Sequence, residues 1–299
     1  MRRHRIAVVG LPFFGRRVAH ALREAGFAAQ YLPHPGRKAR LWPRTVRALV
    51  RADLVYTIGS SARRGGPADL MARARRKIVM HWAGTDVLHA LNDWRAGRVS
   101  ETLLARAEHW AAAPWLVDEL KPMGVRAEAH PLPMVIRTGD DLPLPEDFRV
   151  LVYLATMPHS AYDIDGTMEV VRALPEIPFV LVGGYQPRDV PPNLEVVGWV
   201  EDMKAQYART SALLRLVHHD AMSHSVIEAL GYGRNVLWNY GIPGVQPVSG
   251  VDDAVARLRQ LAAQYDRGAL NETGMETARA YGPERIIPEA TERFRGLLA

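Results

Sequence analysis

Two carboxylates lie on either side of a serine and histidine run in HHDAMSHSVIEAL, residues 218–230. Asp220 precedes the run, Glu228 follows it, and an apolar helical pattern begins between them. Helix N-termini attract phosphate, and the hydroxyls of Ser223 and Ser225 can cap the helix or bind an anion. A carboxylate such as Glu228 can accept two hydrogen bonds from vicinal hydroxyls, as on a ribose. The alternative is a capping acid followed by an exposed glutamate.

The stretch GLPFFG, from Gly10 to Gly15, follows a predicted strand and opens a predicted helix. Its backbone can therefore approach a ligand phosphate. A dinucleotide fingerprint needs three glycines and an acid after the second strand. This chain has two glycines, with PHPG in place of the acid, so an NAD enzyme is disfavoured.

Two further stretches lie at the ends of predicted strands, where open α/β sheets bind their ligands. The first, HWAGTD, runs from His81 to Asp86. His81 is either a functional side chain or a satisfied, partly buried histidine, and Asp86 is either functional or a helix cap. The second ends in Gly183 and Gly184, which form a simple turn or leave room for a ligand.

Short β-branched runs alternate with amphipathic stretches, which predicts an α/β protein with mostly parallel sheets. The pattern occurs twice, on either side of a proline-rich linker at residues 131–148. Predicted strands are residues 5–10, 28–32, 54–58, 77–82, 109–113 and 126–130, then 150–154, 179–182, 194–197, 212–217 and 235–238. Predicted helices are residues 14–25, 87–106 and 114–123, one after 66–67, then 166–173, 202–209, one containing Glu228, and the segments after 238.

Length and composition narrow the class of protein. The 299 residues suit two domains, each large enough for its own core. No apolar run approaches the roughly 20 residues of a membrane-spanning helix, and the N-terminus lacks the apolar region of a signal peptide. The chain has no cysteine, which excludes disulfides, thiolate nucleophiles and cysteine metal sites. We therefore expect a cytoplasmic protein.

The net charge of +6 is concentrated in the first quarter of the chain. Such a charge favours phosphates, acidic glycans, anionic lipid headgroups or nucleic acid as partners, although solvated surface arginines are the alternative. Nucleic acid ranks last, because the arginines are not interleaved with aromatic residues in a recognisable module. The basic residues there include Arg2, Arg3, Arg5, Arg16, Arg17, Arg37, Lys38, Arg40, Arg44, Arg47, Arg51, Arg63 and Arg64.

Seven residues separate Asp220 from Glu228, and this spacing resembles the E-x7-E motif of the retaining family 4 glycosyltransferases of the GT-B fold. The glycine opening, His-x-x-Gly-Thr-Asp from residue 81, Val-Gly-Gly at 182–184, Gly-Trp-Val at 198–200 and Glu-Ala-Leu-Gly-Tyr-Gly from 228 also resemble that family. The motifs follow the family order along nearly the whole chain.

The resemblance implies two Rossmann-like domains facing one another across a cleft. Residues 1–135 would form the acceptor side, with the helix 283–299 packing back onto it, and residues 149–282 would bind the donor. The donor would be a nucleotide-diphosphate sugar, transferred with retention of configuration and without a metal or other cofactor. The implied catalytic residues are Asp220 and, from the opposite domain, His81. The implied donor-binding residues are Glu228 for the ribose, Gly198, Trp199 and Val200 for the base, Ser223, His224 and Ser225 for the diphosphate, and Gly183, Gly184 and Gly15 to leave it room.

The chain departs from the family pattern in two places. The first motif position is Asp220 rather than glutamate, and the Arg and Lys expected after the first donor-domain strand are missing from TMPHSAYDIDG, residues 156–166. A departing diphosphate needs positive charge. We predict that Arg215 supplies it, with His218, His219 and His224 also near the motif.

These features favour a hexosyltransferase-like enzyme of polysaccharide biosynthesis. The basic first half favours an anionic or membrane-associated acceptor, such as a cell-surface glycan or lipid-linked intermediate, and hence a location in the cytoplasm or at the membrane periphery. Two alternatives stay open. One is a non-catalytic sugar-nucleotide-binding or scaffold protein, and the other is a nucleotide-sugar epimerase.

Overall fold

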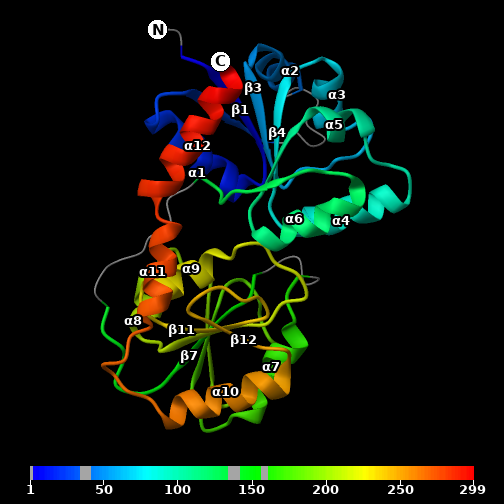
Figure 1. Ribbon diagram of the computed structural model, residues 1–299. Coiled ribbons are helices and arrows are strands. Elements are labelled where there is room, and N and C mark those ends of the chain that lie inside the picture. Colours follow the sequence, from blue (N-terminus) through cyan, green and yellow to red (C-terminus); the bar gives the residue numbers. More distant parts are fainter. Residues whose placement is uncertain (1–2, 34–41, 134–141, 156–160) are drawn as a thin grey trace. The chain divides into compact units, whose positions relative to one another are not determined.

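The computed structural model describes residues 3–33, 42–133, 142–155 and 161–299. The chain divides into two compact units (Figure 1). Unit 1 comprises residues 1–135 together with 283–299, and unit 2 comprises residues 136–282. The last helix, α12 (Pro283–Leu298), therefore belongs to unit 1, where it packs against α1 (Pro12–Glu24).

The described part of unit 1 contains a six-stranded parallel sheet in the order β2-β1-β3-β4-β5-β6. Its strands are β1 (Arg5–Gly10), β2 (Ala28–Leu32), β3 (Leu54–Ile58), β4 (Lys77–Trp82), β5 (Glu108–Ala111) and β6 (Glu128–Ala129). The remaining helices are α2 (Trp42–Arg51), α3 (Pro67–Arg73), α4 (Thr85–Arg95), α5 (Glu101–Arg106) and α6 (Pro114–Leu120), with a 3-10 turn at Lys121–Met123.

The described part of unit 2 contains a second six-stranded parallel sheet in the order β12-β11-β10-β7-β8-β9. Its strands are β7 (Val150–Tyr153), β8 (Phe179–Val182), β9 (Leu194–Gly198), β10 (Ala212–Arg215), β11 (Asn235–Trp238) and β12 (Val245–Pro247). Its helices are α7 (Ile164–Ala173), α8 (Lys204–Ala208), α9 (His224–Gly231), α10 (Val251–Ala263) and α11 (Glu272–Ala280).

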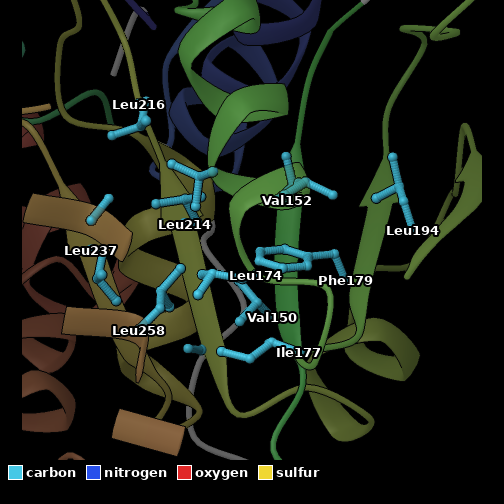
Figure 2. Packing of buried hydrophobic residues seen from close by; sticks show 14 of the residues in the cluster. Val150, Val152, Leu174, Ile177, Phe179, Leu194, Leu214, Leu216, Leu237 and Leu258 are labelled. Atoms are coloured by element: carbon cyan, nitrogen blue, oxygen red, sulfur yellow. The ribbon is translucent and has the colours of Figure 1, made fainter. Parts of the chain in front are cut away.

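The central strands are mostly apolar because helices cover both faces of each sheet. Every residue of β3, β8 and β10 is buried. In unit 2 the aliphatic side chains of β7, β8 and β10 surround Phe179 and meet Leu174 and Leu258 from the helices (Figure 2). The prediction of an α/β protein with parallel sheets is confirmed.

The strand order of unit 2 locates its ligand-binding edge. The chain runs outward from β7 through β8 to β9, then returns to place β10 on the other side of β7. Open α/β sheets bind ligands at the carboxyl ends of the strands where the order reverses, because the loops there diverge and leave a crevice. In unit 2 this point lies between the ends of β7 and β10, at Tyr153 and Arg215.

Two elements were not predicted from the sequence, α2 and β12. The first lies in an arginine-rich segment, where charge obscured its helical periodicity, and the second has only three residues, Val245–Pro247. Of the predicted linker at 131–148, residues 134–141 lie outside the described residues. The described parts, 131–133 and 142–148, contain no helix or strand.

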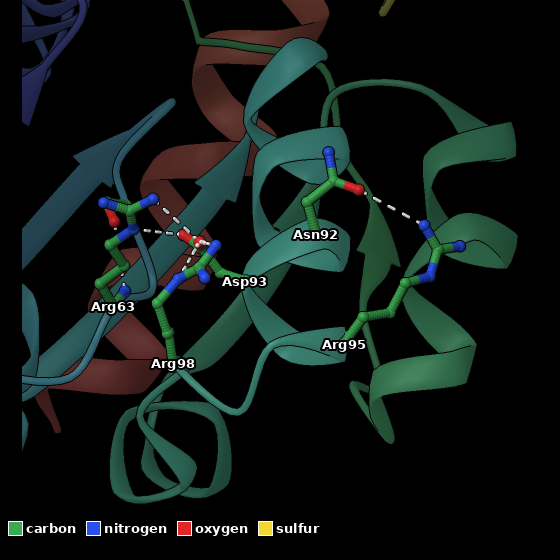
Figure 3. A network of polar contacts seen from close by, with 6 residues as sticks. Arg63, Asn92, Asp93, Arg95 and Arg98 are labelled. Atoms are coloured by element: carbon green, nitrogen blue, oxygen red, sulfur yellow. Dashed lines mark hydrogen bonds and ion pairs between the residues drawn. The ribbon is translucent and has the colours of Figure 1, made fainter.

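A carboxylate below the surface of unit 1 ties two arginines together (Figure 3). Asp93 on α4 accepts two hydrogen bonds from Arg63, at 2.5 and 2.9 Å, and two from Arg98, at 3.0 and 2.8 Å. Hydrogen bonding from Arg63 is the main cause that lowers the pKa of Asp93. The network joins α4 to the segments around residues 63 and 98.

We expect Asp93→Asn to lower the unfolding temperature at neutral pH. Because folding lowers the pKa of Asp93, the ionised carboxylate stabilises the protein above the ordinary aspartate value of 3.8 and ceases to do so as the pH falls below it. The difference between wild type and variant, followed by circular dichroism melts from pH 7 downwards, should therefore shrink in acid. Asp118→Asn is the control, because its pair with Lys121 is solvent-exposed. A difference that stays constant with pH would contradict this role.

Candidate functional site

A buried ion pair lies at the carboxyl end of β10. The Nε of Arg215 lies 2.6 Å from Oδ2 of Asp220, and the two side chains are 8% and 14% exposed. The guanidinium also lies over the ring of Tyr162, 5.1 Å from its centroid. Burial acts to lower the pKa of Arg215, but the charge of Asp220 and the hydrogen bonds that Arg215 donates to Asp220 and Tyr162 outweigh it and raise the pKa. Arg215 is therefore a permanent cation.

The loop after β10 fixes Asp220 on both sides. The backbone N–H of Asp220 donates to the hydroxyl of Tyr240 at 3.2 Å, and its Oδ1 accepts from the backbone N–H of Ala221 at 3.1 Å. Both carboxylate oxygens thus have partners, one cationic and one a backbone donor. Such a carboxylate can orient and neutralise a neighbouring cation.

Glu228, the second carboxylate, is held on α9 by a buried tyrosine. The hydroxyl of Tyr207, in α8, is shared between Oε2 of Glu228 at 3.1 Å and the carbonyl of Ser225 at 3.2 Å. Burial, followed by the charge of Glu228, raises the pKa of Tyr207 well above its usual value. The hydroxyl therefore keeps its proton and donates a hydrogen bond to these acceptors.

Helix α9 begins after Ser223, so the predicted helix between the two carboxylates is present. The side chain of Ser223 does not cap the helix. Its Oγ instead lies 3.0 Å from Oγ of Ser225, and both serines are buried. The first backbone N–H groups of a helix have no partner within the helix, and they form a binding site for anions. His224 is the first helical residue and is partly buried, whereas His218 is exposed and His219 is buried.

The ends of β8 and β9 are joined by their backbones. Gly183 donates its N–H to the carbonyl of Gly198 at 2.8 Å. A Cβ on Gly183 would lie 2.1 Å from the carbonyl oxygen of Leu154, so glycine is required there by strand packing. Gly184 and Val200 are partly buried, but Trp199 is 70% exposed. This ring is a large aromatic surface in contact with solvent.

Electrostatics link these groups into one site in unit 2. Arg215 and Glu228 both act on the pKa values of Tyr153 and Tyr207. The rings of Tyr153 and Tyr162 have centroids 6.5 Å apart. The site therefore gathers side chains from the ends of β7 and β10, the following loops, α8 and α9, at the edge that the strand order identifies.

The three tyrosines at positions 153, 162 and 207 were not predicted as site residues. Tyr153 ends the first strand of unit 2, a position that could have identified it. Tyr207 contacts Glu228 across 21 residues of sequence, and no local pattern signals such a contact.

His81 belongs to unit 1, where it is a packed core residue. It is 1% exposed, its Nδ1 lies 2.5 Å from the hydroxyl of Tyr56, and its Nε2 lies 2.7 Å from the carbonyl of His130. Burial lowers its pKa to about 3, so the ring is neutral. Both ring nitrogens are engaged, as the structural interpretation of this histidine expects.

Local contacts explain why glycine occupies position 15 and aspartate position 86, both also in unit 1. Gly15 lies inside α1, and a Cβ there would lie 2.5 Å from the ring of Tyr31. The residue therefore makes room for that ring. Asp86 accepts a hydrogen bond from the backbone N–H of Ala83 at 3.0 Å and so stabilises the start of α4. Burial raises the pKa of Asp86 to about 7.

The segment 156–166 lacks the expected diphosphate-binding Arg and Lys. It lies partly outside the described residues, because these exclude 156–160. In the described remainder, Asp163 caps α7 by accepting from the N–H of Gly166 at 2.9 Å, and Asp165 is exposed.

No family model and no curated protein matches the sequence. Solved structures do match the fold. The sucrose-phosphate synthase of Thermosynechococcus elongatus has a TM-score of 0.66 at 16% identity, with 99% of each chain covered. AviGT4, a glycosyltransferase involved in avilamycin A biosynthesis, has a TM-score of 0.61 at 16% identity, covering 99% of this chain and 98% of its own. The pneumococcal O-GlcNAc transferase GtfA, solved with UDP and GlcNAc, has a TM-score of 0.62 at 13% identity, and 60% of its length is covered.

The architecture is therefore that of GT-B glycosyltransferases, with two α/β units of parallel strands. In the part of the chain that is described, no helix is long and apolar enough to cross a membrane.

Proposed function

We propose that the chain is a glycosyltransferase that takes a sugar from a nucleotide-diphosphate donor bound to unit 2. The observation that carries the proposal is the fixed position of Glu228. Tyr207 holds this carboxylate on α9, near the buried Arg215–Asp220 pair, at the carboxyl edge where α/β sheets bind ligands.

Each part of the donor has a matching group in unit 2. Glu228 accepts hydrogen bonds from the ribose hydroxyls, and the exposed ring of Trp199 stacks on the base. The N–H groups at the start of α9, from Ser223 to Ser225, receive the diphosphate together with Gly183 and Gly184.

Arg215 and Asp220 act on the reacting centre as a pair. The N–H groups of Arg215 that do not face Asp220 meet the charge that develops on the leaving diphosphate. Both oxygens of Asp220 are engaged, which disfavours this residue as a covalent nucleophile. The arrangement supports transfer with retention by front-face attack, in which the leaving phosphate accepts the proton of the acceptor hydroxyl. Neither a metal nor another cofactor is required by this mechanism.

The acceptor is inferred from charge. Residues 1–64 contain fourteen lysines and arginines and two acids, and this part of unit 1 favours an anionic or membrane-associated acceptor. We accordingly propose a role at the cytoplasmic side of a membrane, in the assembly of a cell-surface or lipid-linked glycan.

A second candidate is a sugar-nucleotide-binding protein without turnover. The pairing of Arg215 with Asp220 favours it, because that pair leaves less net positive charge for a departing diphosphate. An assay for nucleoside diphosphate release separates the two. UDP-, GDP-, ADP- and TDP-sugars are incubated with the chain and with Glu228→Ala. If the wild-type chain releases a nucleoside diphosphate and Glu228→Ala does not, the result supports an enzyme. If a donor binds but no donor yields a nucleoside diphosphate, the result supports the second candidate.

We expect Tyr207→Phe to weaken nucleotide binding about tenfold without unfolding unit 2. The variant keeps the buried ring and removes only the hydroxyl that holds Glu228. Calorimetric titration with the nucleoside diphosphate that binds wild type, and with its 2′,3′-dideoxy counterpart, provides the measurement. The loss should be confined to the ribose-containing ligand. Equal losses for both ligands would show that Tyr207 acts on the fold and does not position Glu228.

A further inference from the structure

Helix α2 presents an apolar and basic surface to solvent. Val46 and Val50 are each 45% exposed, and Arg47 and Arg51 are exposed beside them. Leu49, on the inner side of the same helix, is buried. Residues four apart lie one above the other on a helix, so the two valines form one row and the two arginines form the next. We name these four residues the α2 face.

The sequence around the α2 face is strongly basic. The sequence of α2, WPRTVRALVR, contains no acidic residue. Residues 1–64 contain two acids, Glu24 and Asp53, and the latter is already paired with Arg5 at 3.0 Å. The arginines of the α2 face therefore offer their charge to an external anion.

We propose that the α2 face docks unit 1 on an anionic lipid surface. A helix with an apolar row beside a basic row lies in the plane of a membrane interface. The valines enter the boundary between headgroups and acyl chains, while the arginines extend along that boundary and bind lipid phosphates. A nucleic-acid contact explains the arginines but gives no reason for a row of exposed valines, so the lipid surface accounts for more of the face.

The inference deepens the proposed role at a membrane. Because vesicle binding is measured without a donor or acceptor, its failure is distinguishable from a failure of the proposed sugar transfer. The full chain is centrifuged with phosphatidylcholine vesicles and with phosphatidylcholine–phosphatidylglycerol vesicles. We expect it to sediment with the anionic vesicles alone. High salt should weaken the binding to vesicles. Soluble inorganic phosphate should weaken it no more than sodium chloride does at the same ionic strength.

Two double variants separate the contributions of charge and apolar contact. Arg47→Glu/Arg51→Glu should weaken binding by more than about tenfold, because each basic residue at an anionic surface contributes about fivefold. Val46→Ser/Val50→Ser keeps the charge, and it should still weaken binding measurably. The matched control is Arg188→Glu/Arg279→Glu, which makes the same change of charge on exposed arginines of unit 2.

Circular dichroism melts establish that each variant remains folded. The proposal is overturned if the control loses as much binding as Arg47→Glu/Arg51→Glu, or if the serine variant binds as wild type does. Sedimentation with neutral vesicles to the same extent would also overturn it. So would tighter binding to a duplex DNA oligonucleotide than to anionic vesicles, because the α2 face would then be a nucleic-acid surface.

Discussion

Replacing Arg215 by alanine is expected to reduce sugar transfer by at least about 100-fold and to lower the free energy of unfolding by about 3–5 kcal/mol. The first effect follows because the variant removes the cation that meets the leaving diphosphate. The second follows because Asp220, 14% exposed and 2.6 Å from Arg215, is left as a buried charge without its partner. Turnover and urea unfolding measure the two effects separately.

A double variant distinguishes catalysis from stability. Arg215→Met/Asp220→Leu replaces both charges by apolar groups, and such replacements of buried pairs are often neutral for stability. It should therefore recover most of the unfolding free energy but none of the turnover. Arg172→Ala is the matched surface control, because its contact with Asp189 at 3.7 Å is exposed. Undiminished turnover in Arg215→Ala would contradict the role of this cation.

The second large effect is expected at Arg234, which is fully buried and, within the described residues, donates its side-chain hydrogen bonds to backbone carbonyls. Its guanidinium donates to the carbonyls of Tyr207 at 2.8 Å, Leu142 at 2.8 Å, Tyr232 at 2.6 Å and Pro143 at 2.9 Å. Burial lowers its pKa to about 10, but the group remains charged at neutral pH. One side chain thus joins the start of unit 2 to the ends of α8 and α9.

Arg234→Ala should lower the free energy of unfolding by about 4 kcal/mol or more, because several buried carbonyls lose their donor at once. Urea unfolding followed by circular dichroism measures the loss. Arg234→Lys should recover only part of the stability, since a point charge cannot reach carbonyls spread around a planar guanidinium. The variant should also bind nucleotide less tightly, because α8 carries Tyr207. An alanine variant as stable as wild type would contradict this account.

Much of the fold could be predicted because parallel strands buried on both faces appear as apolar runs. β3 and β8 were found in this way, and Gly26 and Pro114 marked helix ends correctly. Helix α2 was missed because it lies in a segment rich in arginine, which was interpreted only as a region of positive charge.

The candidate site could be predicted in part. The spacing of Asp220 and Glu228 located the loop and helix after β10, but their partners come from distant positions that sequence spacing does not reveal. His81 shows the opposite case. Its position at the end of β4 indicated function, whereas the tertiary contacts with Tyr56 and His130 engage both ring nitrogens. A position at a strand end therefore indicates a candidate site, but it does not show which side chains are already engaged by tertiary contacts.

The most direct test of the donor site is a thermal-shift panel of UDP, GDP, ADP, TDP and NAD, with their common sugar conjugates, on wild type and Glu228→Ala. A ligand that binds only the folded state raises the unfolding temperature by mass action. We predict that one nucleoside diphosphate family stabilises wild type and that Glu228→Ala abolishes the shift. Stabilisation by no nucleotide, or by NAD alone, would contradict the assignment of unit 2 as a nucleotide-sugar site.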